Sequence, residues 1–129
     1  MNTAMNERAG TPSAELEVER DGATLTLRLA RPGRRNALTR TLVTTLRDAL
    51  QAAAGDAGVR TIILTGHGPA FCAGLDLHEL AAAAEQSDTF DTTPLLELYA
   101  QIEASPQPII AAAPGPAAAG GAGLLLLAD

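Results

Sequence analysis

Apolar and polar residues alternate near the start of the chain, which predicts two β-strands. Leu16 and Val18 alternate with polar residues, and leucines occupy every second position over residues 25–29. Asp21-Gly22 lies between the two runs, and an Asp-Gly pair is a strong signal for a tight hairpin turn. We therefore expect an antiparallel hairpin with one buried face.

The pattern then changes to a helical spacing. After a loop over residues 31–36, apolar residues recur at intervals of three and four, and Thr39 stands where a helix N-cap is expected. Gly55 and Gly58 mark the end of this predicted helix. The residues on its apolar face are Leu42, Val43, Leu46, Ala49, Leu50 and Ala53.

Two further apolar runs, at 61–65 and 108–113, predict buried strands. Each run leads into a glycine-rich bend and then into a helical pattern, an order typical of parallel crossovers in an α/β fold. A polar stretch over 86–93 predicts a loop. The expected helices cover about residues 75–85, 94–102 with Pro94 first, and 118–128.

Composition excludes several classes of function. The chain has 129 residues, a net charge of −6 and only 2% aromatic residues, and all nine of its basic residues are arginines. Without lysine it can form neither a Schiff base nor a P-loop of the G-x-x-x-x-G-K type. An acidic chain with few aromatic residues is a poor nucleic-acid binder, although arginines cluster over residues 31–40.

Cellular location is constrained by the single cysteine and by the first residues. Cys72 has no partner for an internal disulfide, which is typical of a reducing compartment. Residues 1–14 are polar and lack the apolar core of a secretory signal, so we expect a flexible N-terminal tail and a cytoplasmic protein. The uncharged stretch over 107–128 is long enough for a membrane span, but three prolines and four glycines interrupt it, so we expect no membrane partner.

The two strand–bend–helix segments carry the candidate chemistry. A helix N-terminus leaves backbone N–H groups without partners, and its dipole favours negative charge. Two such ends that converge would offer a pair of preset donors to a developing oxyanion, and glycine allows a ligand to approach the backbone. The simpler alternative is that Leu75 and Gly120-Gly121 serve core packing alone.

Three segments in the right order resemble the enoyl-CoA hydratase/isomerase (crotonase) family. Residues 70–77, Ala-Phe-Cys-Ala-Gly-Leu-Asp-Leu, resemble its A-F-[SC]-A-G-x-D-[LI] motif, and Arg31-Pro32 with Asn36-Ala37-Leu38 resembles its R-P-x-x-x-N-A-[LM] motif. Residues 107–121 resemble its K-P-[VI]-I-A-A-V-x-G-x-A-x-G-G-G segment. Ala128-Asp129 is similar to the A-x-D that follows it.

The resemblance implies an α/β fold of repeated β-β-α units that form a spiral, here as its N-terminal portion. Residues 15–129 would be the N-terminal part of an acyl-CoA-binding domain, which appears truncated because its last helix is apolar all round and needs cover from elsewhere. No metal and no separate cofactor are implied, because coenzyme A is part of the substrate. Family members assemble as trimers or hexamers, so we expect a homotrimer or hexamer for the full-length protein.

The resemblance also assigns residues. The backbone N–H groups of Leu75 and Gly120 would form the oxyanion hole for the thioester carbonyl. Arginines of the loop, Arg31, Arg34 or Arg35, would contact the phosphates of coenzyme A. The remaining residues expected to contact coenzyme A are Ala37, Ala73, Gly74, Asp76 and Gly121.

One departure limits the expected activity. Gly123 stands where hydratases carry the first of two catalytic glutamates, and the second would lie beyond Asp129. The expected function is polarisation of an acyl-CoA thioester for hydration or double-bond isomerisation. The alternatives are a truncated, non-catalytic CoA-binding fragment, or a sister reaction such as thioester hydrolysis, dehalogenation or decarboxylation.

Two other sites are disfavoured by the sequence. Cys72 invites a nucleophile hypothesis with His67 or His78, but a lone small cysteine in a turn is more often a packed thiol. Asp76 and His78 with Glu79 do not share the helix face that metal ligands need. We expect these three residues to be exposed to solvent.

Overall fold

The first two strands form the predicted hairpin. The computed structural model describes residues 15–86 and 89–129, so the predicted tail over 1–14 lies outside the described residues. Strand β1 (Leu16–Asp21) pairs antiparallel with β2 (Thr24–Leu29), and Gly22 turns between them with φ of 60°. Leu25, Leu27 and Leu29 are buried. The alternation therefore predicted both the strands and their buried face.

The other two strands extend the sheet in parallel. Strand β3 (Thr61–Gly66) pairs with β2, and β4 (Ile109–Ala111) pairs with β3, which gives the order β1-β2-β3-β4. Strand β4 is shorter than the strand predicted over residues 108–113. Ala112, just beyond β4, still donates its N–H to the Leu64 oxygen and accepts from the Thr65 hydroxyl, and Pro114 follows two residues later.

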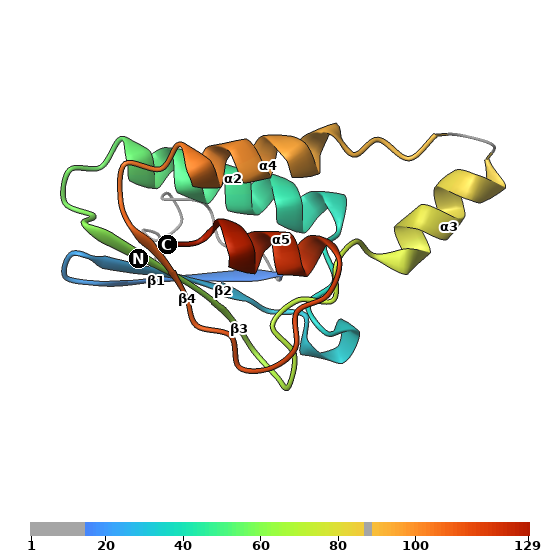
Figure 1. The fold of residues 1–129 in the computed structure, drawn as a ribbon, viewed down its shortest axis with the longest axis horizontal. Coiled ribbons are helices and arrows are strands. Elements are labelled where there is room, and N and C mark those ends of the chain that lie inside the picture. The colour runs from blue at the N-terminus through green and yellow to red at the C-terminus, as the bar shows by residue number, and fades with distance from the viewer. Residues whose placement is uncertain (1–14, 87–88) are drawn as a thin grey trace, which may run out of the picture.

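Helices α2 (Arg40–Ala54), α4 (Thr93–Glu103) and α5 (Gly120–Leu127) lie on the same side of this sheet, whereas α3 (Leu77–Glu85) projects away from it (Figure 1). A short 3₁₀ helix, η2 (Pro32–Arg34), occupies the loop after β2. Consecutive strands β2, β3 and β4 are thus joined by crossovers through helices, as parallel pairing requires.

Helix α2 follows the sequence prediction most closely. The Thr39 side chain accepts a hydrogen bond from the Leu42 N–H at 3.0 Å, which makes it the N-cap, and Gly55 is the C-cap. Such a cap contributes about 1 kcal/mol to helix stability. All six predicted apolar positions are buried, so this face of α2 forms a large part of the core.

Three helix starts differ from the predictions. The prediction that a helix begins at Leu75 is wrong, because Leu75 is still extended and α3 begins at Leu77. Helix α4 begins one residue earlier, at Thr93, so Pro94 is its second residue. Helix α5 begins at Gly120 rather than 118, because the Ala118 N–H bonds to the Cys72 oxygen outside the helix.

The core lies between the sheet and the helices. Phe71 and Leu124 are fully buried there, together with leucines of β2 and α2. Helix α5 nevertheless leaves Leu126 82% exposed, in agreement with its apolar character on all sides. In the described part of the chain, no helix combines the length and the apolar character that a membrane crossing requires.

Candidate functional site

The loop after β2 and the bend after β3 lie side by side. Leu38 and Leu75 form a parallel β-bridge, in which the Leu38 N–H donates to the Gly74 oxygen at 2.7 Å and the Asp76 N–H donates to the Leu38 oxygen at 3.0 Å. The Ala73 N–H donates to the Arg35 oxygen at 3.0 Å. These bonds join the first two of the three sequence motifs.

The bends after β3 and β4 are joined in the same way. Cys72 and Ala117 form a second parallel bridge, and the Ala118 N–H donates to the Cys72 oxygen at 3.0 Å. The Phe71 N–H donates to the Pro116 oxygen at 2.9 Å. The three motifs, which are far apart in the sequence, therefore form adjacent strips of backbone.

This arrangement brings the backbones of Gly74 and Gly120 together. A Cβ atom built at Gly74 would lie 3.2 Å from the Gly120 nitrogen, and φ of Gly74 is 97°, a conformation that favours glycine. Among the residues that the structure describes, neither the Leu75 N–H nor the Gly120 N–H has a protein acceptor. The two free donors thus belong to neighbouring bends. The Gly120 N–H lies at the N-terminus of α5, and the Leu75 N–H lies two residues before α3 begins.

The turn that leads into α5 has an unusual backbone conformation. Ala119 has φ of 49° and ψ of −121°, and the Gly121 N–H donates to the Ala118 oxygen at 2.8 Å. These values are close to the first central position of a type II′ turn, about +60° and −120°, where glycine is strongly preferred. Ala119 therefore holds a strained conformation directly before the Gly120 N–H.

Asp76 is buried, which corrects the expectation that it is exposed to solvent. Its carboxylate caps α3 by accepting from the Glu79 N–H at 3.0 Å and pairs with the Arg31 guanidinium at 3.2 Å. Burial acts to raise the Asp76 pKa, but the Glu79 N–H, Arg31 and the His78 N–H outweigh it and hold the pKa below its ordinary value. Asp76 is therefore ionised at neutral pH and fixes the bend that carries Leu75.

Arg31 is committed to contacts within the protein. It donates to the Ala37 oxygen at 2.6 Å as well as to Asp76, and its side chain is only 17% exposed. Arg34 and Arg35 are exposed, and Arg34 contacts the His78 side chain. These two arginines, rather than Arg31, are the candidate ligands for a phosphate.

Asn36 connects the loop after β2 to the bend after β3. It is fully buried, and its backbone has φ of 55°, a left-handed conformation that asparagine tolerates. Its side chain accepts from the Arg31 N–H at 2.8 Å and donates to the His67 and Ala70 oxygens at 2.9 and 3.0 Å. The motif asparagine thus has a structural role, since all three bonds are internal.

A cavity of about 320 Å³ opens beside this loop. Arg34 and Arg35 line it together with Leu75, so the two exposed arginines and the residue of one candidate donor border the same space. Gly120 and Gly121 are not among the residues that line it. The predicted CoA-contacting residues in the lining are Arg35, Ala37, Ala73 and Asp76.

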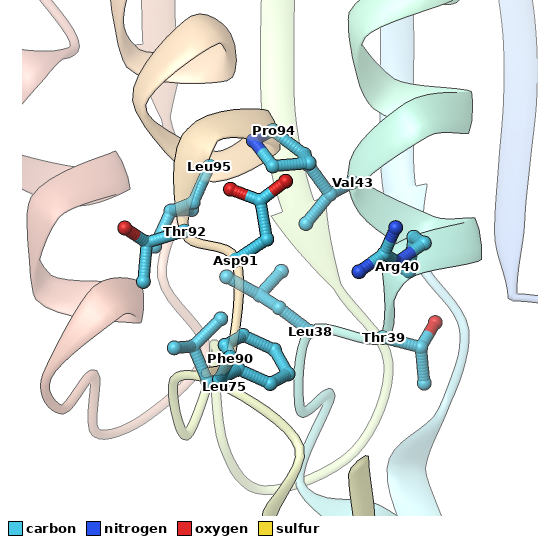
Figure 2. Close-up of a pocket in the computed structure, with 10 residues that line it drawn as sticks. All are labelled: Leu38, Thr39, Arg40, Val43, Leu75, Phe90, Asp91, Thr92, Pro94 and Leu95. Carbon is cyan, nitrogen blue, oxygen red and sulfur yellow. The ribbon is translucent and has the colours of Figure 1, made fainter. Parts of the chain in front are cut away.

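Leu75 also lines a second, more enclosed pocket (Figure 2). Leu38, Val43 and Leu95 give it apolar walls, and Asp91 and Arg40 are the charged residues that line it. Its volume of about 20 Å³ has room for a water molecule but not for an acyl chain. A bound acyl group therefore cannot occupy this pocket as it stands.

Tyr99 is a residue of this region that sequence reasoning missed. Its hydroxyl donates to the Gly120 oxygen at 2.8 Å, and a Cβ atom built at Gly123 would lie 2.5 Å from that hydroxyl oxygen. Tyr99 is the only tyrosine in the chain. In the sequence, only its position directly after Leu98, beside the apolar face of α4, could have indicated that it packs against the rest of the protein.

The alternative nucleophile and metal sites gain no support. Cys72 is fully buried, and burial raises the pKa of its thiol. Both observations fit a packed thiol, which is the role that the sequence favoured. His67 pairs with Glu17 at 2.7 Å, and His78 contacts Arg34. Over residues 15–86 and 89–129, no group of three or more His, Cys, Asp or Glu side chains is arranged to hold a metal ion.

Comparison with known proteins identifies related sequences. A family model described as enoyl-CoA hydratase/isomerase matches residues 19–129. The probable enoyl-CoA hydratase echA6 of Mycobacterium tuberculosis is 46% identical over 107 residues, which is 83% of this chain and 42% of the relative. The 2,3-dehydroadipyl-CoA hydratase of Escherichia coli is 40% identical over 116 residues, or 90% of this chain and 45% of the relative. The chain thus spans less than half the length of these curated relatives.

Solved structures show the same similarity in three dimensions. A Pseudomonas aeruginosa protein superposes with a TM-score of 0.86 at 34% identity, covering 92% of this chain and 52% of that protein. An enoyl-CoA hydratase from Mycobacterium avium subsp. paratuberculosis superposes with a TM-score of 0.80 at 28% identity, covering 92% and 46% of the two chains.

Proposed function

Because the chain belongs to the enoyl-CoA hydratase/isomerase family and has the α/β fold of its N-terminal portion, we propose that it binds an acyl-CoA and polarises the thioester carbonyl. The Leu75 and Gly120 N–H groups would donate to the carbonyl oxygen. One observation carries the proposal: both donors lack a protein acceptor in the described chain, and their bends lie so close that a Cβ atom built at Gly74 would come within 3.2 Å of the Gly120 nitrogen.

The polarising role follows from the charge that the reaction creates. When a nucleophile or base attacks an enoyl- or acyl-thioester, negative charge develops on the carbonyl oxygen. Fixed N–H donors stabilise this charge without reorganisation, and the loss of one donor typically lowers the rate by about 10²–10³-fold. No metal is needed for this step in the proposed mechanism.

The cavity beside the loop would receive coenzyme A. Arg34 and Arg35 would pair with its phosphates, and the strip that contains Ala37, Ala73 and Asp76 would meet the adenine end. Gly74 and Gly121 would contribute by allowing close approach of the backbone. The full-length protein would be cytoplasmic, as the lone cysteine and the polar N-terminus favour, and a homotrimer or hexamer, as the family resemblance implies.

The need for proton transfer separates a catalytic chain from one that only binds acyl-CoA. Hydration or double-bond isomerisation needs an acid or base, and the first family glutamate position is Gly123 here. The chain therefore lacks the carboxylate that a family hydratase carries at this position. The Tyr99 ring over Gly123 favours the second candidate, a chain that binds acyl-CoA without catalysing its hydration.

Two measurements on the same sample test the proposal. Thermal unfolding with acetyl-CoA at 100 times its Kd should show about 2.7 kcal/mol of added stability, and ATP should give much less. Hydration of crotonyl-CoA then separates an enzyme from a binding chain. Absence of any stabilisation by acetyl-CoA in a folded sample contradicts the proposal.

A further inference from the structure

The Tyr99 hydroxyl links helix α4 to the first turn of α5. It donates to the Gly120 oxygen at 2.8 Å, and a Cβ atom built at Gly120 would lie 3.4 Å from it. The ring also covers Gly123, where a Cβ atom would lie 2.5 Å from the hydroxyl oxygen and 2.7 Å from Cζ. Any side chain at position 123 would displace Tyr99, so these two residues form a matched pair.

The turn that Tyr99 holds is the strained one. Ala119 keeps φ of 49° and ψ of −121°, values that suit glycine and not alanine. Rotation about ψ of Ala119 turns the peptide between Ala119 and Gly120, and the Gly120 N–H turns with it. A strained conformation persists only when its surroundings hold it, and the Tyr99 hydrogen bond is made to the very next residue.

We propose that Tyr99 is a positioning residue of the thioester site: its hydroxyl holds the Ala119–Gly120 turn so that the Gly120 N–H stays directed at the bound carbonyl oxygen. This inference rests on the proposed function. Tyr99 acts through the backbone and need not touch the substrate. It also explains why a glycine at 123 and an alanine at 119 occur together in this chain.

The state of the phenol agrees with a donor role. Burial raises the Tyr99 pKa, and the neighbouring Cys72 thiol raises it further. The hydroxyl therefore keeps its proton at neutral pH and can donate to the Gly120 oxygen.

The test compares two ligands that differ only at the carbonyl. Acetyl-CoA has a thioester C=O and S-ethyl-CoA does not, so the ratio of their affinities in calorimetry measures the carbonyl contribution alone. In Tyr99→Phe the preference for acetyl-CoA should fall about fivefold, as for one ordinary hydrogen bond, while the affinity for S-ethyl-CoA stays within twofold.

Two additional variants exclude a general structural effect. Tyr99→Phe combined with Ala119→Gly should regain the preference, because glycine adopts the turn without strain. Gly123→Ala should lower the preference as Tyr99→Phe does, because the added Cβ displaces the ring. Urea unfolding confirms that each variant is folded before its ligands are compared.

The outcomes separate the two proposals. If the unaltered chain binds both ligands equally, the proposed thioester function is contradicted. If the unaltered chain prefers acetyl-CoA and Tyr99→Phe keeps the full preference, the function stands and the positioning role of Tyr99 is overturned. Failure of Ala119→Gly to restore the preference overturns the role as well.

Discussion

Gly121 lies directly against the backbone of Cys72. A Cβ atom at position 121 would come within 2.2 Å of the Cys72 oxygen and 2.7 Å of its Cβ atom. The first turn of α5 therefore meets the bend after β3 with no side chain between them. This contact, with the bridge between Cys72 and Ala117, holds the two candidate donor segments at a fixed separation.

Gly121→Ala should be strongly destabilising. The clash is with backbone atoms, which cannot move aside as a flexible side chain can, so we expect a loss of about 3 kcal/mol or more in the free energy of unfolding by urea. Gly55→Ala is the matched control, since only the Ala52 oxygen lies near its Cβ position, at 3.8 Å. Equal stability of the two variants would contradict the close packing.

Asp76→Asn should lower stability at neutral pH and change its pH dependence. Asparagine still caps α3, but it loses the charge that pairs with Arg31, for a cost of about 1.5–3 kcal/mol. The folded-state pKa of Asp76 lies below its unfolded value of about 3.9. Its contribution is therefore complete above that value and is lost as the pH falls through the folded pKa.

Urea unfolding of both proteins at neutral pH and in the acidic range checks this expectation. The stability difference between the unaltered chain and Asp76→Asn should shrink as the pH drops below about 4. The exposed Asp48, changed to Asn, is the control and should cost little at any pH. A difference that stays constant on acidification would show that the carboxylate charge is not the source.

Asn36→Asp removes the two hydrogen bonds that the Asn36 amide donates and places a buried carboxylate against the same two carbonyl oxygens. Aspartate has the same size and tolerates the left-handed backbone, and it can still accept from the Arg31 N–H. It cannot donate to the His67 and Ala70 oxygens when ionised. We expect a loss of about 2–4 kcal/mol at neutral pH in chemical unfolding, and a loss below 1 kcal/mol would mean that these bonds are not important.

Arg35→Gln should weaken the binding of acetyl-CoA by about tenfold and make it less sensitive to salt. The change removes a cation from the cavity that would hold the phosphates, and the loss of a charge-assisted hydrogen bond has about this effect. Arg60→Gln removes the same charge at the other end of β3 and should leave binding unchanged. Similar losses in both variants would point to net charge alone and not to a phosphate contact.

Local patterns predicted most of the fold because their signals lie within a few residues. The Asp21-Gly22 turn and the Thr39 cap followed from neighbouring residues alone, and both are confirmed. The start of α3 was predicted wrongly although a local signal existed: Asp76 precedes Glu79 by three residues, as in a capping box. Leu75 stays extended because of its bridge to Leu38, a partner that spacing could not reveal.

The candidate site was predictable only in part. Its glycine-rich bends were visible as motifs, but their contact depends on the isolated bridge between Cys72 and Ala117, which joins two segments far apart in the sequence. Gly123 was recognised as a missing glutamate, whereas the Tyr99 ring above it comes from another helix. Packing between distant segments fixes such pairs, and hydrophobic periodicity does not encode them.

The proposed pair of donors can be observed directly by proton–nitrogen NMR. Titration with acetyl-CoA should move the Leu75 and Gly120 amide protons downfield, because each would donate to the thioester oxygen, whereas S-ethyl-CoA should leave both nearly unmoved. If the two ligands shift these amides equally, or if only one of the two amides responds to acetyl-CoA, the two-donor site is contradicted.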